Sequence, residues 1–233
     1  VQTPAYATLT AFGVSCWAAY AWVRAWESDG AWAQAATGLL IGMLVLVRLE
    51  TVLFVAVWGV GLLILRRWRF LGAFMAGGLV PLGLLLAYNT TQFGNPLHAG
   101  ILRGNMNILT FKADFVWAGL AGLQSGLLWY SMLIVLGIVG LLASRKPQLM
   151  ILGWGGLALV ALVLVRVPVM YFCVGEGAQT VDGIVIACPT DWDAVLQLIR
   201  FDINRYVIPL VPFSVLGLRE LLTRLLKIQE QIV

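Results

Sequence analysis

The sequence predicts an all-α, polytopic integral membrane protein with about seven transmembrane helices and two longer extracytoplasmic loops. Of the 233 residues, 61% are hydrophobic and 11% are charged, whereas a soluble domain carries about 45–50% apolar and about 25% charged residues. The apolar residues form runs close to the roughly 20 residues that span a hydrocarbon core, and none alternates like a barrel strand. We therefore expect a multi-pass protein of the cell (inner or plasma) membrane, surrounded by membrane lipid and without a nucleic-acid partner.

The first four predicted spans are 5–23, 31–47, 51–65 and 70–88. Short polar or basic segments separate them: the turn 27–30, then Arg48-Leu49-Glu50, then the basic cluster 66–69. The fourth span contains Gly77-Gly78 and Pro81, and such residues are common inside membrane helices.

Three further spans are predicted at 126–143, 149–165 and 206–222, and the two long loops are 89–125 and 168–204. Together, residues 1–233 are predicted to form a single transmembrane helical domain. The chain begins almost inside a span, without a basic leader segment. We therefore expect it to be part of a longer chain.

The short basic connections predict the orientation of the spans. If the spans alternate in direction, one side carries Arg66, Arg67, Arg69, Arg145, Lys146, Arg219, Arg224 and Lys227. Lys and Arg gather in cytoplasmic connections, so this side is predicted to be cytoplasmic. Both long loops and the Arg48–Glu50 turn are then extracytoplasmic.

Several basic residues lie on the predicted outer side, against this trend: Arg48, Arg103, Lys112, Arg166, Arg200 and Arg205. A charge at the centre of a membrane helix costs roughly 2.5–3.5 kcal/mol on insertion scales. Guanidinium groups at headgroup level are suited to phosphate, to which they bind in a bidentate manner. The alternative is that each Arg extends to the interface or pairs with a nearby acid.

Other polar residues of the two loops are weaker candidates. His98 has the chemistry to hydrogen-bond a phosphate or a sugar hydroxyl, but a solvated loop histidine fits the sequence as well. Asp202 precedes Arg205 at the mouth of the last span. Cys173 and Cys188 share the second loop and flank a strand-like stretch, 181–187, so they form either a disulfide or two free thiols. With three cysteines and one histidine, we expect no metal site and no cofactor.

Four segments, in order, resemble motifs of the GT-C glycosyltransferases, the polytopic enzymes related to protein O-mannosyltransferases and to the aminoarabinose transferase of lipid A. Residues 38–50, GLLIGMLVLVRLE, look like the family's GLLLGLAxLTRPE turn. Residues 88–100 resemble the family's loop that follows a paired-helix segment. Residues 126–131, GLLWYS, resemble the family's entry to the next span. Residues 204–213, NRYVIPLVPF, are similar to the PRYLLPALPF segment near the last helix.

The resemblance implies a polyprenyl-phosphate sugar donor held by basic residues at the outer face of the membrane. Carried over by position, Arg48 and Arg205 become contacts of the donor phosphate, and Glu50 and Tyr206 become neighbours that orient them. We add Arg103 and Arg166 as further phosphate contacts, and His98 and Asp202 as supporting residues. The family's catalytic carboxylate, a general base, belongs to an outer loop after its first span. This sequence has no such loop, so we assign no catalytic residue.

Two functions follow from this sequence. The first is the C-terminal portion of a GT-C-like enzyme that transfers a hexosyl or pentosyl unit from polyprenyl phosphate. The alternative is a non-catalytic scaffold subunit of a larger membrane complex, in which small-residue faces such as Gly77-Gly78 and 153–156 let helices pack closely. A transporter or channel is less well supported, because the spans lack paired interior acids and a broken-helix repeat.

Overall fold

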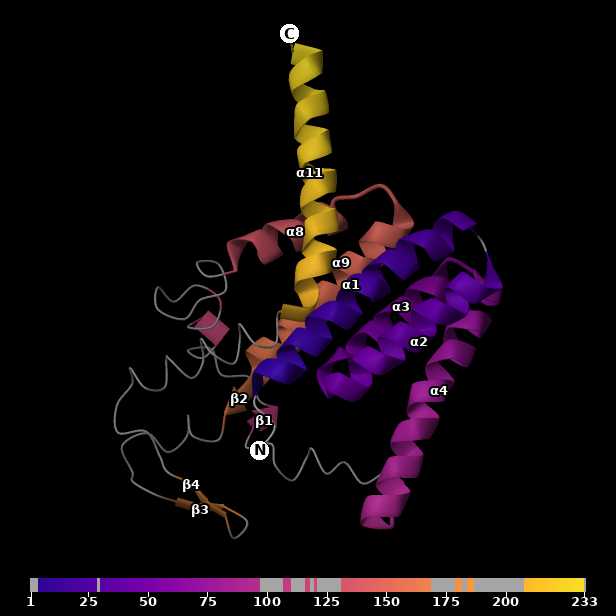
Figure 1. Ribbon diagram of the computed structural model, residues 1–233. Helices are drawn as coiled ribbons and strands as arrows, with labels where there is room; N and C mark the ends of the chain where they lie inside the picture. The colour runs from indigo at the N-terminus through magenta and orange to yellow at the C-terminus, as the bar shows by residue number, and fades with distance from the viewer. Residues whose placement is uncertain are drawn as a thin grey trace. The chain divides into compact units, whose positions relative to one another are not determined.

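The computed structural model describes residues 4–28, 30–96, 107–109, 116–117, 120, 131–168, 179–181, 184–186 and 208–232. These residues contain seven α-helices: α1 (Pro4–Ser28), α2 (Ala31–Val47), α3 (Val52–Ile64), α4 (Trp68–Phe93), α8 (Met132–Leu142), α9 (Pro147–Val165) and α11 (Val211–Ile232) (Figure 1). Two short 3₁₀ helices, η1 (Leu49–Thr51) and η3 (Ile208–Leu210), precede α3 and α11. The helical prediction is confirmed, with one helix in each predicted span.

Two of these helices, α4 and α9, are long and apolar enough to cross a membrane. The helices α2, α3 and α8 are apolar but shorter. Length and composition therefore support membrane association for α4 and α9.

Three helix ends lie beyond their predicted positions. The helix α1 ends at Ser28, five residues past the predicted end at 23, so it includes Glu27 and Ser28 of the predicted turn. The helix α4 continues through residues 89–93, which we had assigned to the first loop, and it ends at Gly94 with φ of 69°, a left-handed conformation that favours glycine. The hydroxyls of Thr90 and Thr91 donate to the carbonyls of Leu86 and Tyr88, so these polar residues are satisfied inside the helix. Similarly, α11 runs to Ile232, ten residues past the predicted end.

The chain forms two compact units. The first comprises 1–98, 133–159 and 207–233, and it holds most of the helices. The second comprises 99–132 and 160–206. Its described strands form two antiparallel pairs: β1 (Asn107–Leu109) with β2 (Arg166–Pro168), and β3 (Gln179–Val181) with β4 (Ile184–Ile186). The second pair places strand structure in most of the stretch 181–187.

Glycines set the closest helix contacts of the first unit. A Cβ at Gly38 of α2 would overlap the backbone carbonyl of Phe74, and one at Gly77 of α4 would overlap that of Ala35. Further along, a Cβ at Gly42 would lie 2.7 Å from the Pro81 ring. Gly38 lies against Phe74 and, further along both helices, Gly42 lies against Pro81, so α2 and α4 run in the same direction and in close contact.

A second glycine contact joins α8 to α11. A Cβ at Gly140 would overlap the Gly217 carbonyl, and one at Gly217 would overlap the Gly137 carbonyl. Beside them, the Ser214 hydroxyl donates to the Ile134 carbonyl over 3.3 Å. The glycines of 153–156 likewise face side chains of α3 and α8, including Phe54. The small-residue faces 77–78 and 153–156 therefore pack helices of this chain against one another.

An aromatic cluster fills the centre of the first unit. The side chains of Trp22, Trp58, Phe54, Phe70 and Phe213 are almost completely buried. Ring centroids are 4.4 Å apart for Trp22 and Trp58, 5.4 Å for Trp22 and Phe70, and 5.3 Å for Phe54 and Phe213. These contacts join α1, α3, α4 and α11.

Candidate functional site

The candidate site is the turn between α2 and α3. The helix α2 ends at Arg48, whose backbone N–H donates to the Leu44 carbonyl over 2.8 Å while its own φ and ψ of −145° and 101° lead the chain out of the helix. Thr51 closes the turn, because its backbone N–H and its hydroxyl both donate to the Arg48 carbonyl, over 3.0 and 2.6 Å. The turn is thus fixed by its own backbone.

The Arg48 side chain is buried, with 6% of its surface exposed. Its Nη2 donates to the Thr8 hydroxyl over 3.0 Å, which links the end of α2 to the beginning of α1. Glu50 is half-buried in η1, two residues further on. A guanidinium held in place and largely removed from water is chemically suited to bind an oxyanion, because charge-assisted hydrogen bonds are strongest in such surroundings.

The structure describes the side chains of only these two predicted site residues. Arg166 is the first residue of β2, where its backbone pairs with Leu109, and it belongs to the second unit. The other predicted residues lie outside the described ranges: His98, Arg103, Cys173, Cys188, Asp202, Arg205 and Tyr206.

An apolar groove lies between α2, α3 and α4, with a cavity volume of about 160 Å³. Its walls come from the later part of α2, from the first turns of α3 and from the middle of α4, and they include Val45, Leu46, Val52, Val55 and Leu82. Because Leu46 and Val52 flank the Arg48–Thr51 turn in the chain, one end of the groove lies near that turn, and the groove extends from there toward Phe74 in the first half of α4. Sequence reasoning missed this groove, since it depends on how three helices pack.

Basic residues cluster at the end of the first unit that lies opposite the Arg48–Thr51 turn. The indole N–H of Trp22, late in α1, donates to the Gln148 carbonyl at the start of α9, and its ring lies against Phe70 at the start of α4. The Arg67 guanidinium covers the Trp26 ring, 3.9 Å from its centroid. The end of α1, the α3–α4 turn and the start of α9 are therefore neighbours.

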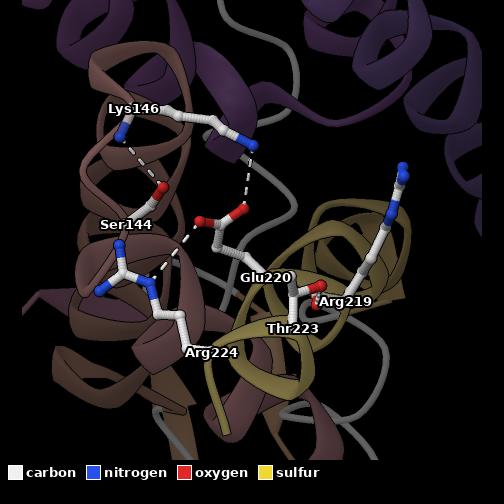
Figure 2. A network of polar contacts seen from close by, with 6 residues as sticks. All are labelled: Ser144, Lys146, Arg219, Glu220, Thr223 and Arg224. Atoms are coloured by element: carbon white, nitrogen blue, oxygen red, sulfur yellow. Dashed lines mark hydrogen bonds and ion pairs between the residues drawn. The ribbon is translucent and has the colours of Figure 1, made fainter. Parts of the chain in front are cut away.

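A polar network brings α11 to this end as well (Figure 2). Lys146 Nζ lies 3.2 Å from Glu220 Oε2, and Arg224 Nε lies 3.6 Å from Glu220 Oε1. The Ser144 hydroxyl accepts the backbone N–H of Lys146 in the same turn. The Glu220–Arg224 spacing is readable in the sequence as a helical i, i+4 pair, but the contact with Lys146 spans 74 positions and has no local signal.

We call this region the cationic end. It holds nine of the chain's fifteen Lys and Arg residues: Arg24, Arg66, Arg67, Arg69, Arg145, Lys146, Arg219, Arg224 and Lys227. Arg48 lies at the other end of α2, whose 17 residues span about 25 Å at 1.5 Å per residue.

Comparison with known proteins found no matching family model, no matching curated protein and no matching solved structure. The resemblance of the four sequence motifs to GT-C glycosyltransferases therefore stays a prediction.

Proposed function

We propose that this chain is the membrane-embedded portion of a GT-C-like glycosyltransferase that takes its sugar from a polyprenyl-phosphate donor at the outer face of the membrane. The observation that carries the proposal is Arg48, a buried guanidinium fixed in a hydrogen-bonded turn. This turn lies at the end of the helical unit opposite the cationic end.

The proposed membrane topology follows from the separation of these two ends. Positive charge gathers on the cytoplasmic side of membrane proteins, so the cationic end faces the cytoplasm of the cell membrane. With seven spans of alternating direction, the Arg48–Thr51 turn then faces outward, together with residues 94–125 and 168–204.

The donor has two chemically different parts, and the outward half of the first unit offers a match for each. The phosphate is the partner of Arg48, which binds oxyanions through paired N–H groups. The polyprenyl chain fits the apolar groove between α2, α3 and α4, whose walls approach the same turn. Burial of apolar surface there contributes about 25 cal/mol per Å² to binding.

The remaining members of the proposed site complete the phosphate contacts. Arg205, Arg103 and Arg166 are proposed as further contacts of the donor phosphate, and Glu50 and Tyr206 as residues that orient the arginines. His98 and Asp202 have supporting roles. The acceptor hydroxyl is activated by a carboxylate that we do not assign to any residue of this sequence.

The scaffold alternative has less support. Its small-residue faces do not favour it over the enzyme, because Gly77 and Gly155 pack α4 and α9 against α2 and α3 of the same chain. In a scaffold, the buried Arg48 would serve only to link α2 to α1 through Thr8.

The test is transfer of a labelled sugar from polyprenyl phosphate in membranes that contain the full-length protein. Arg48→Ala is expected to lower the transfer rate by about 100-fold or more, because it removes a fixed charge from the reacting phosphate. Arg48→Lys keeps the charge but lacks the paired N–H groups, so its transfer rate should lie between the rate of the unmodified protein and that of Arg48→Ala.

Two control variants separate catalysis from folding. Thr8→Val removes the hydrogen bond to Arg48 but keeps the guanidinium, and Arg69→Ala removes an exposed cation at the other end. Both should retain most of the activity. Normal transfer by Arg48→Ala, at normal expression and helix content, would exclude the proposed site.

A further inference from the structure

The second half of α11 is amphipathic in a way that the transferase proposal does not explain. Leu222, Leu225 and Leu226 are 57%, 54% and 60% exposed. At 100° per residue these leucines share one arc of the helix. Arg219, Thr223 and Lys227 are spaced at i, i+4 and form a stripe outside that arc.

This half of α11 extends beyond the helices that pack against its first half. Where its side chains are described, α11 contacts other elements through Leu221, which lies beside Gly140, and through the ion pair of Glu220 with Lys146. From Glu220 the helix continues for twelve residues to Ile232, which is about 18 Å at 1.5 Å per residue. Figure 1 shows this part of α11 passing beyond the α8–α9 turn.

The surrounding charges indicate what covers the exposed leucines. Arg219 and Lys227 are exposed, while Glu220 is held by Lys146 and Arg224. The local surface is therefore positive, and the remaining cations of the cationic end add to it. A leucine face beside a basic stripe is typical of helices that lie in the boundary of an anionic bilayer.

A second copy of the helix is a poorer partner. The apolar heptad repeat that begins at Leu218 covers two heptads, fewer than the three or four of a stable coiled coil. The flanking positions are Leu222, Arg224 and Gln229, which offer no opposite charges to an identical helix.

We propose that residues 219–227 of α11 form a binding surface for anionic lipid. Leu222, Leu225 and Leu226 lie at the boundary between headgroups and acyl chains, and Arg219 and Lys227 bind lipid phosphates. This surface acts independently of the proposed sugar transfer, because it lies at the opposite end from Arg48.

The test is hydrogen–deuterium exchange of the full chain in nanodiscs, either of phosphatidylcholine alone or with added phosphatidylglycerol. Backbone amides of 222–232 are expected to exchange at least about fivefold more slowly with the anionic lipid. This factor corresponds to the attraction of one Lys or Arg to an anionic membrane surface, about 1 kcal/mol. The double variant Arg219→Gln/Lys227→Gln should lose this difference. The matched control, Arg69→Gln/Arg145→Gln, removes two exposed cations of the same end from other elements and should keep it.

A second arm tests the apolar face. Leu222→Ser/Leu226→Ser changes exposed residues only, so the fold is retained and the protection should fall in both lipids. Equal exchange of 222–232 in the two lipids would overturn the proposal. Protection that depends on two chains per disc, whatever the lipid charge, would also overturn it and would indicate a helix pair instead.

Discussion

At Gly77, the absence of a side chain sets the distance between α2 and α4, because a methyl group there would overlap the Ala35 carbonyl. Backbone on both sides cannot shift as a side chain can. We expect Gly77→Ala to lower the free energy of unfolding by about 1–3 kcal/mol, the usual range for overpacking. Denaturation in mixed detergent micelles, followed by circular dichroism, measures this change.

Gly72 of the same helix provides the matched control. A Cβ at Gly72 would meet no atom within 4 Å, so Gly72→Ala should be neutral or stabilise the helix by up to about 1 kcal/mol. Equal stability of the two variants would show that α2 and α4 do not approach each other as described.

Single residues also show where sequence reasoning reaches its limit. The sequence predicted that Arg48 lies in a turn next to the end of a span, and the structure places it there. Its burial and its bond to Thr8, forty positions away, were not predictable. Such contacts depend on which helices become neighbours, and neither periodicity nor composition contains that information.

Among the elements, α11 is held to α8 by two kinds of contact that differ in strength. Lys146 and Glu220 form an ion pair in which the lysine is 59% exposed, and such pairs contribute about 0–1 kcal/mol. The Gly217 contact is close backbone packing. We expect a double-mutant cycle of Lys146→Gln and Glu220→Gln to give a coupling below about 1 kcal/mol, and Gly217→Ala to cost about 1–3 kcal/mol.

Unfolding in mixed micelles gives each of these values. If the Lys146–Glu220 coupling energy exceeded the cost of Gly217→Ala, the ion pair would be the stronger contact, and α11 would be held chiefly by charge.

The helices themselves were predictable, and their ends were less so. Long apolar runs located all seven, since each run needs an environment free of water. The ends of α4 and α11 were placed too early, because we ended each span where polar residues begin. Thr90 continues α4 with its hydroxyl bonded to the preceding turn, and the helix ends where Gly94 adopts positive φ. In α11, Arg224 and Lys227 follow the predicted span end at 222, but both are good helix formers and the helix continues through them.

For the whole first unit, the sequence predicted that basic turns alternate with apolar runs, and the structure adds that the basic turns meet. Trp22 connects α1 to the start of α9, and Glu220 connects α11 to Lys146. The three clusters around Arg67, Lys146 and Arg224 could have lain apart in a different packing of the same helices. Their common location gives the proposed orientation its physical basis.

That orientation can be tested in intact cells with a membrane-impermeant maleimide. Gln92, near the end of α4, and Arg145, in the α8–α9 turn, are both exposed. The helix α4 begins beside Trp22 at the cationic end, and its 26 residues span about 39 Å. We expect Gln92→Cys to add one label to the background of the native cysteines in intact cells, and Arg145→Cys to add one only after permeabilisation. The opposite pattern would place Arg48 at the cytoplasmic face, where a donor at the outer leaflet cannot reach it. Labelling of both positions in intact cells would mean that the two ends of α4 are not separated by a bilayer, which would remove the membrane topology on which the proposed transferase depends.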